Sequence, residues 1–407
     1  MKYLNKLIKN IKNPFGKFNG NELNYILQVL DSESEETKKI SWVQRFEEAF
    51  TKKLDVNYAV AVNTATSGLH AALFAAGVKE GDEVIQPSKT VVMDSYVTIH
   101  LGATPVFADI DPNTWNISIE EIEKKITPRT KAIIVVSLYG LPVDIDPIMD
   151  LAKKHNIIVI DDSAETMVSK YKGKFAGTHA HMGVYSFEKS KHMTSGSEGG
   201  MIVTNDKNLA ELTRKFAGIG YKGLSASAGR TSLASSTYQD PNYERFDLIG
   251  LNYRMNQITA AIGLAQFERI EFLVGRRKKI GQMFLEAIKN CSWLVSQEIP
   301  NNVDHSYFTF GVRYLGEKSK GIKWKEFYNL YKNMGGDGFY ACWKPPYLEP
   351  SLYGKKIGDK IFKEGLCTID ENYQKSLMVF KTNYRNLDEA KKQTIILSKL
   401  IDKIGRA

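Results

Sequence analysis

Short apolar runs alternate with helix-like segments along residues 58–165, and this alternation restricts the possible folds more than any other feature of the chain. The runs are rich in valine and isoleucine and have the length of buried strands. The segments between them repeat apolar residues at helical spacing. Strand followed by helix, with strands that are apolar on both faces, is typical of an α/β fold in which helices cover both sides of a mostly parallel sheet.

The expected elements follow one another in a simple order. Strands are predicted at residues 58–63, 82–87, 103–111, 131–140 and 156–165, and helices at residues 66–77, 118–126 and 145–155. Ligands of α/β sheets bind at the carboxyl ends of the strands. The polar clusters of this segment fall at those ends, so we expect the functional site there.

The chain has 407 residues, which suits one large domain with a smaller one. We expect residues 40–275 to form the large domain and residues 276–407 to form a smaller α/β domain. Residues 1–39 are predicted to be an N-terminal segment that packs on the small domain. With neither an internal repeat nor a low-complexity linker in the sequence, we expect one compact unit.

The net charge of +9 comes from 55 basic and 46 acidic residues that are interspersed. This pattern indicates a solvated surface and argues against a nucleic-acid-binding protein. The basic run at residues 275–279 is likewise expected on the solvated face of a long helix. The three cysteines, Cys291, Cys342 and Cys367, are too few and too scattered for a disulfide framework or a metal site. Neither a secretory h-region nor a membrane-spanning stretch is evident, so we expect a cytoplasmic protein.

The segment SFEKSKHMTSGSEGGM, residues 186–201, places Lys189 and Lys191 between a strand-like run and a glycine turn. Asp162 ends the strand-like run IIVIDD, where a buried carboxylate is costly without a partner. The turn NTATSG, residues 63–68, opens a helix with free N–H groups and hydroxyls, which suits a phosphate. A lysine for a Schiff base, a carboxylate for the ring nitrogen and a phosphate cup are together what pyridoxal phosphate requires.

Each of these elements taken alone has an ordinary structural explanation. Lys191 fits a lysine at a helix end, Asp162 fits a helix cap, and the turn at residues 63–68 fits an N-cap. Arg254 fits an interface salt bridge, and His192 fits a packing residue better than a base. The occurrence of all the elements in order along one parallel sheet favours the cofactor site.

From residue 21 to residue 384 the chain resembles the DegT/StrS-type aminotransferases. The resemblance is carried by motifs such as YAVAVNTATSGLHAAL, GATPVFADIDPNT, VIDDSAE, SFEKSKHMTSGSEGG and GLNYRMNQITAAIGLAQ. It implies a fold type I transferase that depends on pyridoxal phosphate and aminates a keto sugar, usually a nucleotide-linked one. Glutamate or glutamine would be the amino donor, in amino-sugar or surface-polysaccharide biosynthesis.

The resemblance also implies roles for individual residues. The pattern SFxxxK assigns the cofactor lysine to Lys191 and leaves Lys189 without a role. Asp162 would face the pyridine nitrogen, and Asn252 would reach the phosphate in the neighbouring subunit of a homodimer with shared active sites. The residues expected to hold the phosphate within the same chain are Thr66, Ser67 and Ser186.

The sequence departs from the family pattern at three places. Glu165 stands where the family usually has Gln or His near the cofactor's phenolic oxygen. Val91 stands where an aromatic ring commonly stacks on the pyridine. The turn TSGSEGG, residues 194–200, is one residue longer than the common form.

Substrate recognition is expected in the loops at residues 218–247 and 340–354, which are rich in aromatic and hydroxylated residues. Candidate substrate-binding residues are Arg254, His192 and Arg230, and ordinary surface charge is the alternative for Arg230. Two other functions remain open. A related sugar dehydratase has His in place of the lysine, so Lys191 argues against it while the adjacent His192 keeps it open. The other alternative is a non-catalytic sensor or scaffold.

Overall fold

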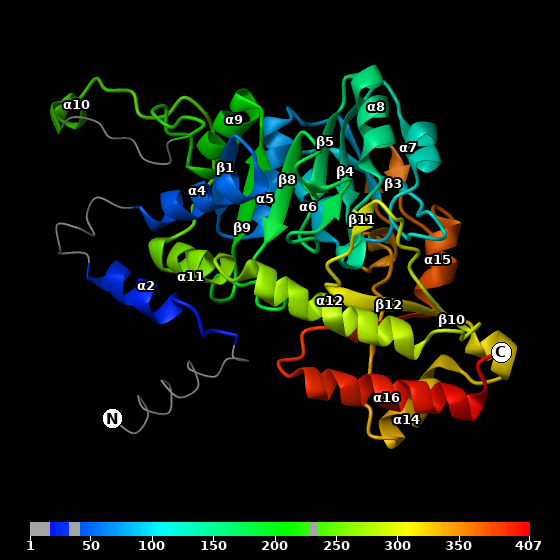
Figure 1. Cartoon of the computed structure of the whole chain (residues 1–407). Coiled ribbons are helices and arrows are strands. Elements are labelled where there is room, and N and C mark those ends of the chain that lie inside the picture. The colour runs from blue at the N-terminus through cyan, green and yellow to red at the C-terminus, as the bar shows by residue number, and fades with distance from the viewer. Residues whose placement is uncertain (1–16, 32–40, 228–234) are drawn as a thin grey trace.

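The computed structural model describes residues 17–31, 41–227 and 235–407. Its largest element is a seven-stranded sheet with the strand order β1-β9-β8-β5-β4-β2-β3 (Figure 1). β9 is antiparallel to both neighbours, and the other strands run parallel to one another. The strands are β1 (Tyr58–Val62), β2 (Glu83–Pro87), β3 (Thr104–Ala108), β4 (Thr130–Val136), β5 (Ile158–Asp162), β8 (Met182–Ser186) and β9 (Gly200–Thr204).

Buried side chains alternate between the two faces of this sheet, as the pleat of each strand requires. On β1, Val60 and Val62 belong to one core, whereas Ala59 and Ala61 belong to the core on the other face. The first core is completed by α5 (Ala65–Ala75), α6 (Met93–His100) and α9 (Lys207–Ala217). The opposite face is covered by α4 (Trp42–Leu54), α7 (Ile119–Lys125), α8 (Ile145–His155) and α11 (Gln257–Phe267). The predicted α/β architecture is therefore confirmed.

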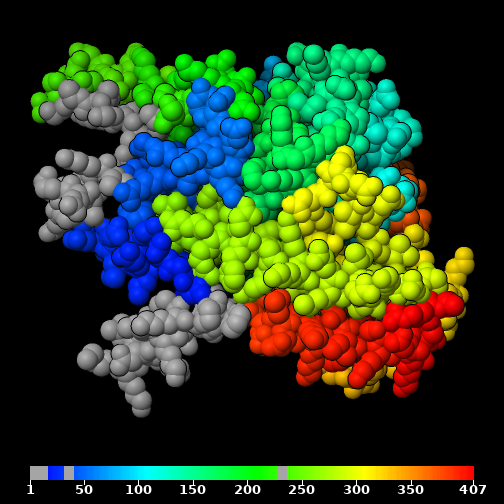
Figure 2. All heavy atoms as spheres, in the orientation of Figure 1, coloured from blue at the N-terminus to red at the C-terminus, as the bar shows by residue number. Residues whose placement is uncertain are grey.

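A second, smaller sheet is antiparallel and lies towards the C-terminus, with the order β10-β12-β16-β13. Its aromatic core includes Phe284, Phe310, Phe327 and Phe380. Figure 2 shows this part, in yellow to red, packed along one side of the rest of the molecule. Its elements are β10 (Leu294–Ser296), β12 (Thr309–Tyr314), α14 (Trp324–Asn333), β13 (Tyr340–Ala341), α15 (Thr368–Gln374), β16 (Leu377–Lys381) and α16 (Leu387–Ile404).

Helix α12 (Ile270–Ala287) takes part in both cores. Ile270 and Val274 pack in the core of the large sheet, whereas Ile280 and Phe284 pack in the core of the small sheet. The helix thus passes through the predicted limit at residue 275, and the division into residues 40–275 and 276–407 stays a prediction.

The described part of the N-terminal segment, α2 (Glu22–Leu30), lies on α11. The Tyr25 hydroxyl donates to Glu268 at 2.5 Å, and the Tyr25 ring packs on Trp42 with 4.8 Å between the ring centroids. The predicted packing of the N-terminal segment, residues 1–39, on the small domain also concerns residues 1–16 and 32–39, which lie outside the described residues. The contact with α11 follows from the apolar face of α2, because Tyr25 and Val29 join the core around Trp42.

The remaining elements are short. They are β6 (Lys170–Tyr171), β7 (Lys174–Phe175), α10 (Ser235–Gln239), β11 (Val303–Asp304), α13 (Gly316–Lys320), β14 (Lys356–Ile357), β15 (Lys360–Ile361) and two 3-10 turns, Leu138–Gly140 and Pro346–Leu348.

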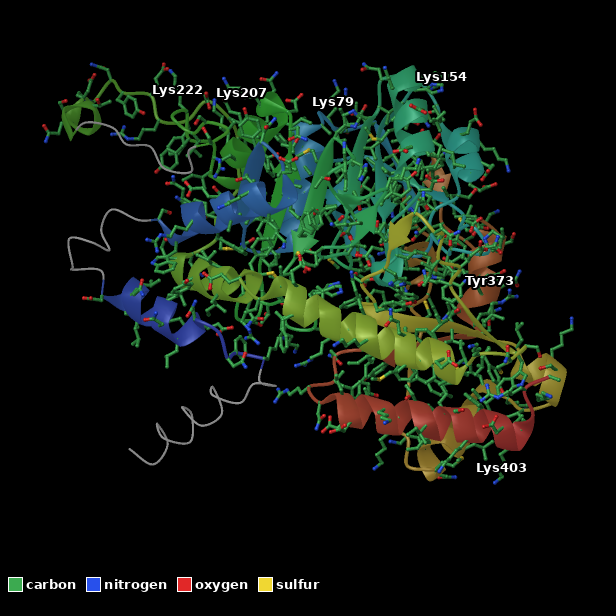
Figure 3. The ribbon with its side chains drawn as sticks, viewed as in Figure 1. Lys79, Lys154, Lys207, Lys222, Tyr373 and Lys403 are labelled. Carbon is green, nitrogen blue, oxygen red and sulfur yellow. The ribbon has the colours of Figure 1, made fainter. Side chains whose placement is uncertain are left out.

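Positive charge is spread over the surface. The labelled lysines Lys79, Lys154, Lys207, Lys222 and Lys403 extend outwards from separate parts of the fold (Figure 3), and all five are exposed. Within the described ranges, no helix combines the length and apolar character needed to cross a bilayer. The same residues contain no group of three or more His, Cys, Asp or Glu side chains placed to hold a metal ion.

Candidate active site

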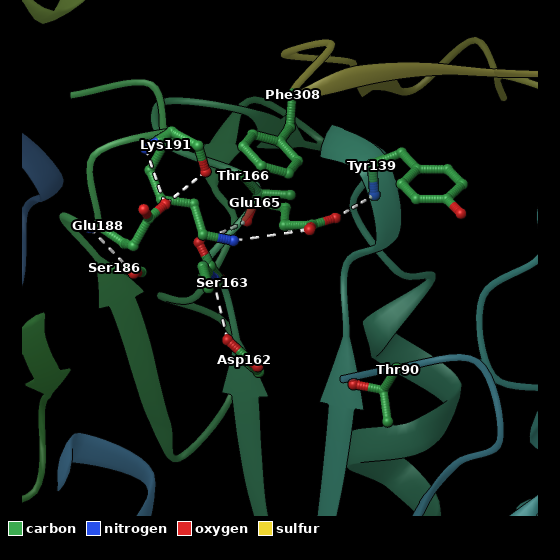
Figure 4. Close-up of polar contacts among 12 residues, drawn as sticks. Thr90, Tyr139, Asp162, Ser163, Glu165, Thr166, Ser186, Glu188, Lys191 and Phe308 are labelled. Carbon is green, nitrogen blue, oxygen red and sulfur yellow. Dashed lines mark hydrogen bonds and ion pairs between the residues drawn. The ribbon is translucent and has the colours of Figure 1, made fainter. Parts of the chain in front are cut away.

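Asp162, Glu165 and Lys191 meet at the carboxyl ends of β5 and β8 and line one cavity of about 390 Å³. Asp162 is the last residue of β5, and Glu165 follows in the next loop. Lys191 lies in the loop between β8 and β9. We refer to these three residues as the Lys191 cluster. Figure 4 shows the Lys191 ammonium directed towards Glu165.

The Lys191 ammonium is held loosely by its neighbours. Its Nζ lies 3.6 Å from Oε1 of Glu165 and 4.4 Å from the centroid of the Phe308 ring. Oε2 of Glu165 accepts a hydrogen bond from the backbone N–H of Tyr139 at 2.7 Å. Tyr139 has a φ of 59°, a left-handed conformation that is strained for a residue with a side chain. A strained backbone thus fixes the carboxylate beside the lysine.

Two adjacent buried carboxylates at the end of β5 point to different surroundings, because side chains alternate along a strand. Asp161 accepts hydrogen bonds from the Gly177 N–H at 2.9 Å and from the Ser137 hydroxyl at 3.4 Å. Asp162 instead lines the cavity, where Oδ1 accepts from the Ala164 N–H at 3.0 Å. Burial raises the pKa of Asp162 to about 6, and the charge of Lys191 opposes that rise. The carboxylate is therefore predominantly ionised at neutral pH.

Arg277 of α12 binds the backbone of the loop that carries Lys191. The basic run at residues 275–279, to which Arg277 belongs, was expected on a solvated helix face. The Arg277 side chain is only 7% exposed. Its guanidinium donates to the carbonyls of Ser190 at 2.7 Å, Lys191 at 3.0 Å and Phe308 at 2.6 Å. Burial lowers the pKa of Arg277 to about 9. The sequence does indicate that Arg277 is buried. It lies three positions after the apolar Val274, and residues three positions apart share a helix face.

The predicted phosphate turn, residues 63–68, follows β1 and therefore lies at the same end of the sheet as the carboxyl ends of β5 and β8. Thr64 caps α5, and its hydroxyl accepts from the Ser67 N–H at 3.0 Å. Thr66 is half-buried in the first turn of that helix. Ser186 ends β8 and pairs with Gly200, which pairs in turn with the last residue of β1. The register therefore brings the serine and the turn to one end of three adjacent strands.

The other predicted residues lie elsewhere. Asn252 and Arg254 line a separate cavity of about 630 Å³, and the Asn252 side-chain oxygen accepts from Nε of Arg254 at 3.0 Å. His192 is buried, with Nε2 at 3.2 Å from the Ser306 carbonyl, and burial lowers its pKa well below the usual range. It fits the packing role. Arg230 lies outside the described residues.

The sequence matches the DegT/DnrJ/EryC1/StrS aminotransferase family over residues 17–364. The chain belongs to this family. This aminotransferase is 40% identical over 294 residues to the GDP-perosamine synthase of Escherichia coli O157:H7, across 72% of this chain and 75% of that protein.

Solved structures extend the similarity over nearly the whole aminotransferase. The aminotransferase of Psychrobacter cryohalolentis is 28% identical with a TM-score of 0.82, covering 94% of this chain and 97% of that one. An E. coli GDP-4-keto-6-deoxy-D-mannose-3-dehydratase with bound hydrated PLP is 25% identical with a TM-score of 0.78, covering 92% and 96% of the two chains. The fold type I assignment is therefore confirmed.

Proposed function

We propose that this aminotransferase uses pyridoxal phosphate to convert a ketone of a nucleotide-linked sugar into an amine. Glutamate or glutamine is the donor, and the product serves amino-sugar or surface-polysaccharide biosynthesis. The observation that carries the proposal is the Lys191 cluster, in which one ammonium and two carboxylates face a single cavity. The GDP-perosamine synthase relative supports a nucleotide-linked substrate.

The donor groups of the cavity and of the neighbouring strand ends fit pyridoxal phosphate. The ionised Asp162 supplies an acceptor for the protonated ring nitrogen, and Val91 lines the cavity as an apolar contact for the ring. The hydroxyls of Thr66, Ser67 and Ser186, with the N-terminus of α5, suit the phosphate. When bound, pyridoxal phosphate supplies an electron sink for the carbon that loses or gains the amino group.

Lys191 is the residue placed to move the proton. Its amine takes a proton from the donor's α-carbon and later delivers one to the substrate carbon, which requires the amine to be free of tight ion pairing. The 3.6 Å separation from Glu165 satisfies this, since it is longer than a hydrogen bond. Glu165 orients the ammonium, and the Tyr139 N–H fixes Glu165. The Gln or His usual at this position lacks the negative charge that attracts Lys191.

We also propose a homodimer in which each chain completes its partner's site. Asn252 is exposed and lies apart from the cavity of its own chain. The segment just before it presents Phe246 at 54%, Ile249 at 95% and Leu251 at 42% exposure. Contiguous exposed apolar residues mark interaction surfaces. A second copy on this surface brings Asn252 towards the phosphate in the other subunit.

A cytoplasmic location is proposed on the state of the thiols. Cys291, Cys342 and Cys367 are all buried and free. Unpaired cysteines are typical of proteins kept in a reducing compartment.

The dehydratase and scaffold alternatives have less support. A dehydratase of this family needs a histidine where this chain has Lys191, and the adjacent His192 is buried against Ser306. A non-catalytic scaffold has no need for a loosely paired lysine in a cavity.

The proposed function is tested with the purified holoenzyme. Glutamate should bleach its visible absorbance, and a nucleotide-linked keto sugar should restore it with formation of an amino sugar. Mass spectrometry of the product separates the alternatives, because an amino sugar contains a nitrogen that a deoxy sugar lacks. If glutamate leaves the absorbance unchanged, or if only free cyclitols or sugar phosphates react, the proposal is wrong in its donor or in its nucleotide.

A further inference from the structure

A second lysine lies in the same cavity as Lys191. Lys89 follows β2, its side chain is 3% exposed, and it lines the cavity. Its ammonium forms an ion pair with the fully buried Asp370 and lies 3.6 Å from Sγ of Cys342. We refer to Lys89, Cys342 and Asp370 as the Lys89 cluster. No sequence motif assigns a role to Lys89 or Asp370.

The position of the Lys89 cluster is fixed by both parts of the molecule. Asp370 lies in the first turn of α15, and its backbone N–H and that of Ile369 donate to Asp109 at 3.0 and 2.8 Å. Sγ of Cys342 lies 3.1 Å from the Tyr139 hydroxyl. The backbone N–H of Tyr139 also donates to Glu165, so Tyr139 joins the Lys89 cluster to the Lys191 cluster.

Stability does not explain a buried ion pair at this place. Removing two charges from water costs about as much as their attraction returns, so apolar residues of similar size give equal stability. Lys89 also faces a cavity that is otherwise lined mainly by apolar groups such as Leu138 and Val379. A ligand that uses the ammonium is a better explanation.

The charge balance indicates what kind of group this ligand presents. Asp370 neutralises Lys89, so a carboxylate that approached the ammonium would also meet the charge of Asp370. An uncharged hydroxyl meets no such repulsion. An ammonium has three N–H donors, of which Asp370 and Cys342 occupy two in the described structure. Trp343, 62% exposed, adds an aromatic surface to the same cavity.

We propose that Lys89 donates a hydrogen bond to a hydroxyl of the acceptor sugar and thereby determines acceptor specificity. This inference rests on the proposed function, since it concerns the second half of that reaction. Lys89 has no part in the first half, in which the donor amino acid reacts at Lys191. The two half-reactions therefore separate the role of Lys89 from that of the Lys191 cluster.

The test compares the holoenzyme with Lys89→Met and with the double variant Lys89→Met/Asp370→Leu, which leaves no unpaired buried charge. Glutamate should bleach the visible absorbance of all three proteins at rates within about twofold. Amination of the keto sugar used for the wild type should lose roughly 10- to 100-fold in kcat/KM in both variants, because the sugar hydroxyl loses its partner. Lys79→Met is the matched control, since Lys79 is exposed and extends outwards from the fold.

Monodeoxy analogues of the same keto sugar identify the contact. The wild type should discriminate against one analogue, and the double variant should accept that analogue and the parent sugar about equally. A slower glutamate reaction with an unchanged sugar reaction would overturn the proposal, because Lys89 would then bind the donor. Equal discrimination by all the proteins would overturn it as well. A wild-type enzyme that bleaches with glutamate but aminates no keto sugar instead refutes the proposed function, and this inference with it.

Discussion

Each of the two lysine clusters places an ammonium near a carboxylate, but the two clusters hold the ammonium differently. In the Lys191 cluster, the ammonium is 3.6 Å from Glu165 and its side chain is 16% exposed. In the Lys89 cluster, the ammonium contacts Asp370 directly and its side chain is 3% exposed. An ammonium 3.6 Å from its carboxylate makes no hydrogen bond to it, whereas an ammonium in direct contact acts as a fixed hydrogen-bond donor. The geometry around each lysine thus fits a different role in the same cavity: proton transfer for Lys191 and sugar recognition for Lys89.

The largest effect that distinguishes the clusters is expected from Lys191→Ala. Turnover should fall by more than about 10³-fold, because the variant loses the group that carries the proton. Both half-reactions should fail, unlike the selective loss expected for Lys89 variants. Stopped-flow absorbance with glutamate, followed by product analysis, measures this. Lys189→Ala is the control, since that side chain is exposed, and it should retain full activity. Multiple turnover by Lys191→Ala would remove the distinction between the two lysines.

The Lys191 cluster was predictable because Asp162 has a local sequence signal and because Lys191 and Glu165 lie in motifs that resemble the family pattern. The apolar run 157–160 predicted β5 and hence the position of Asp162, and strand alternation explains why this carboxylate rather than Asp161 faces the cavity. The match to the family pattern then identified Lys191. Backbone geometry such as the left-handed Tyr139 leaves no comparable pattern, because it depends on the surrounding packing.

The Lys89 cluster depends on contacts between distant residues, which a single sequence does not encode locally. Lys89 and Asp370 are brought together by the packing of α15 against the strand ends. Helix α6 (Met93–His100) was not predicted for a different, local reason. Its eight residues include β-branched Val97 and Thr98 and carry weak helical periodicity. The prediction of a solvated face for residues 275–279 is wrong at Arg277, which is buried, whereas Lys279 is exposed.

The next prediction concerns the partner chain: Asn252 of one chain should be needed for the activity of the two clusters in the other. Lys191→Ala and Asn252→Asp proteins should each be nearly inactive alone, the second because its new charge repels the cofactor phosphate. After equal mixing and subunit exchange, activity should recover to about a quarter of the wild-type value. Half of the dimers are then mixed, and one of their two sites is intact.

Native mass spectrometry verifies the exchange, and the steady-state rate measures the recovery. Confirmed exchange without recovery would mean that Asn252 serves the site of its own chain. In that case both clusters form a complete site within a single chain.

Arg277 links the two parts of the cavity, because it binds the carbonyls of Lys191 and Phe308 together. Arg277→Met should lower kcat about tenfold, since the loop that positions Lys191 loses its hydrogen bonds and buried carbonyls lose their donor. KM for the sugar should change less, because the hydrogen bonds of Arg277 go to Ser190, Lys191 and Phe308 and not to the Lys89 cluster. Arg277→Lys should restore part of the rate. Lys279→Met, an exposed change on the same helix, is the control. A loss confined to KM would show that Arg277 supports sugar binding instead.

The last prediction concerns stability instead of activity and compares Asp162 with Asp370. Burial raises the pKa of both carboxyls, but Asp370 has a direct cation and Asp162 has only the more distant charge of Lys191. The pKa of Asp162 is about 6 in the folded protein against an ordinary value of 3.8. Its protonated form therefore stabilises the fold below pH 4, and this contribution is lost as the pH rises through 6.

Asp162→Asn, which resembles the protonated carboxyl at every pH, should consequently make the cofactor-free protein more stable at pH 8 and leave it unchanged at pH 4. The difference in the free energy of unfolding should be roughly 3 kcal/mol at pH 8, from 1.36 kcal/mol per pKa unit. Part of this free-energy difference comes from the buried Asp94, because its pKa is raised first by burial and second by the charge of Asp162. Urea unfolding at both pH values measures it. A variant less stable than the wild type at pH 8 would mean that Lys191 compensates Asp162 as fully as Lys89 compensates Asp370, and the two clusters would then be electrostatically alike.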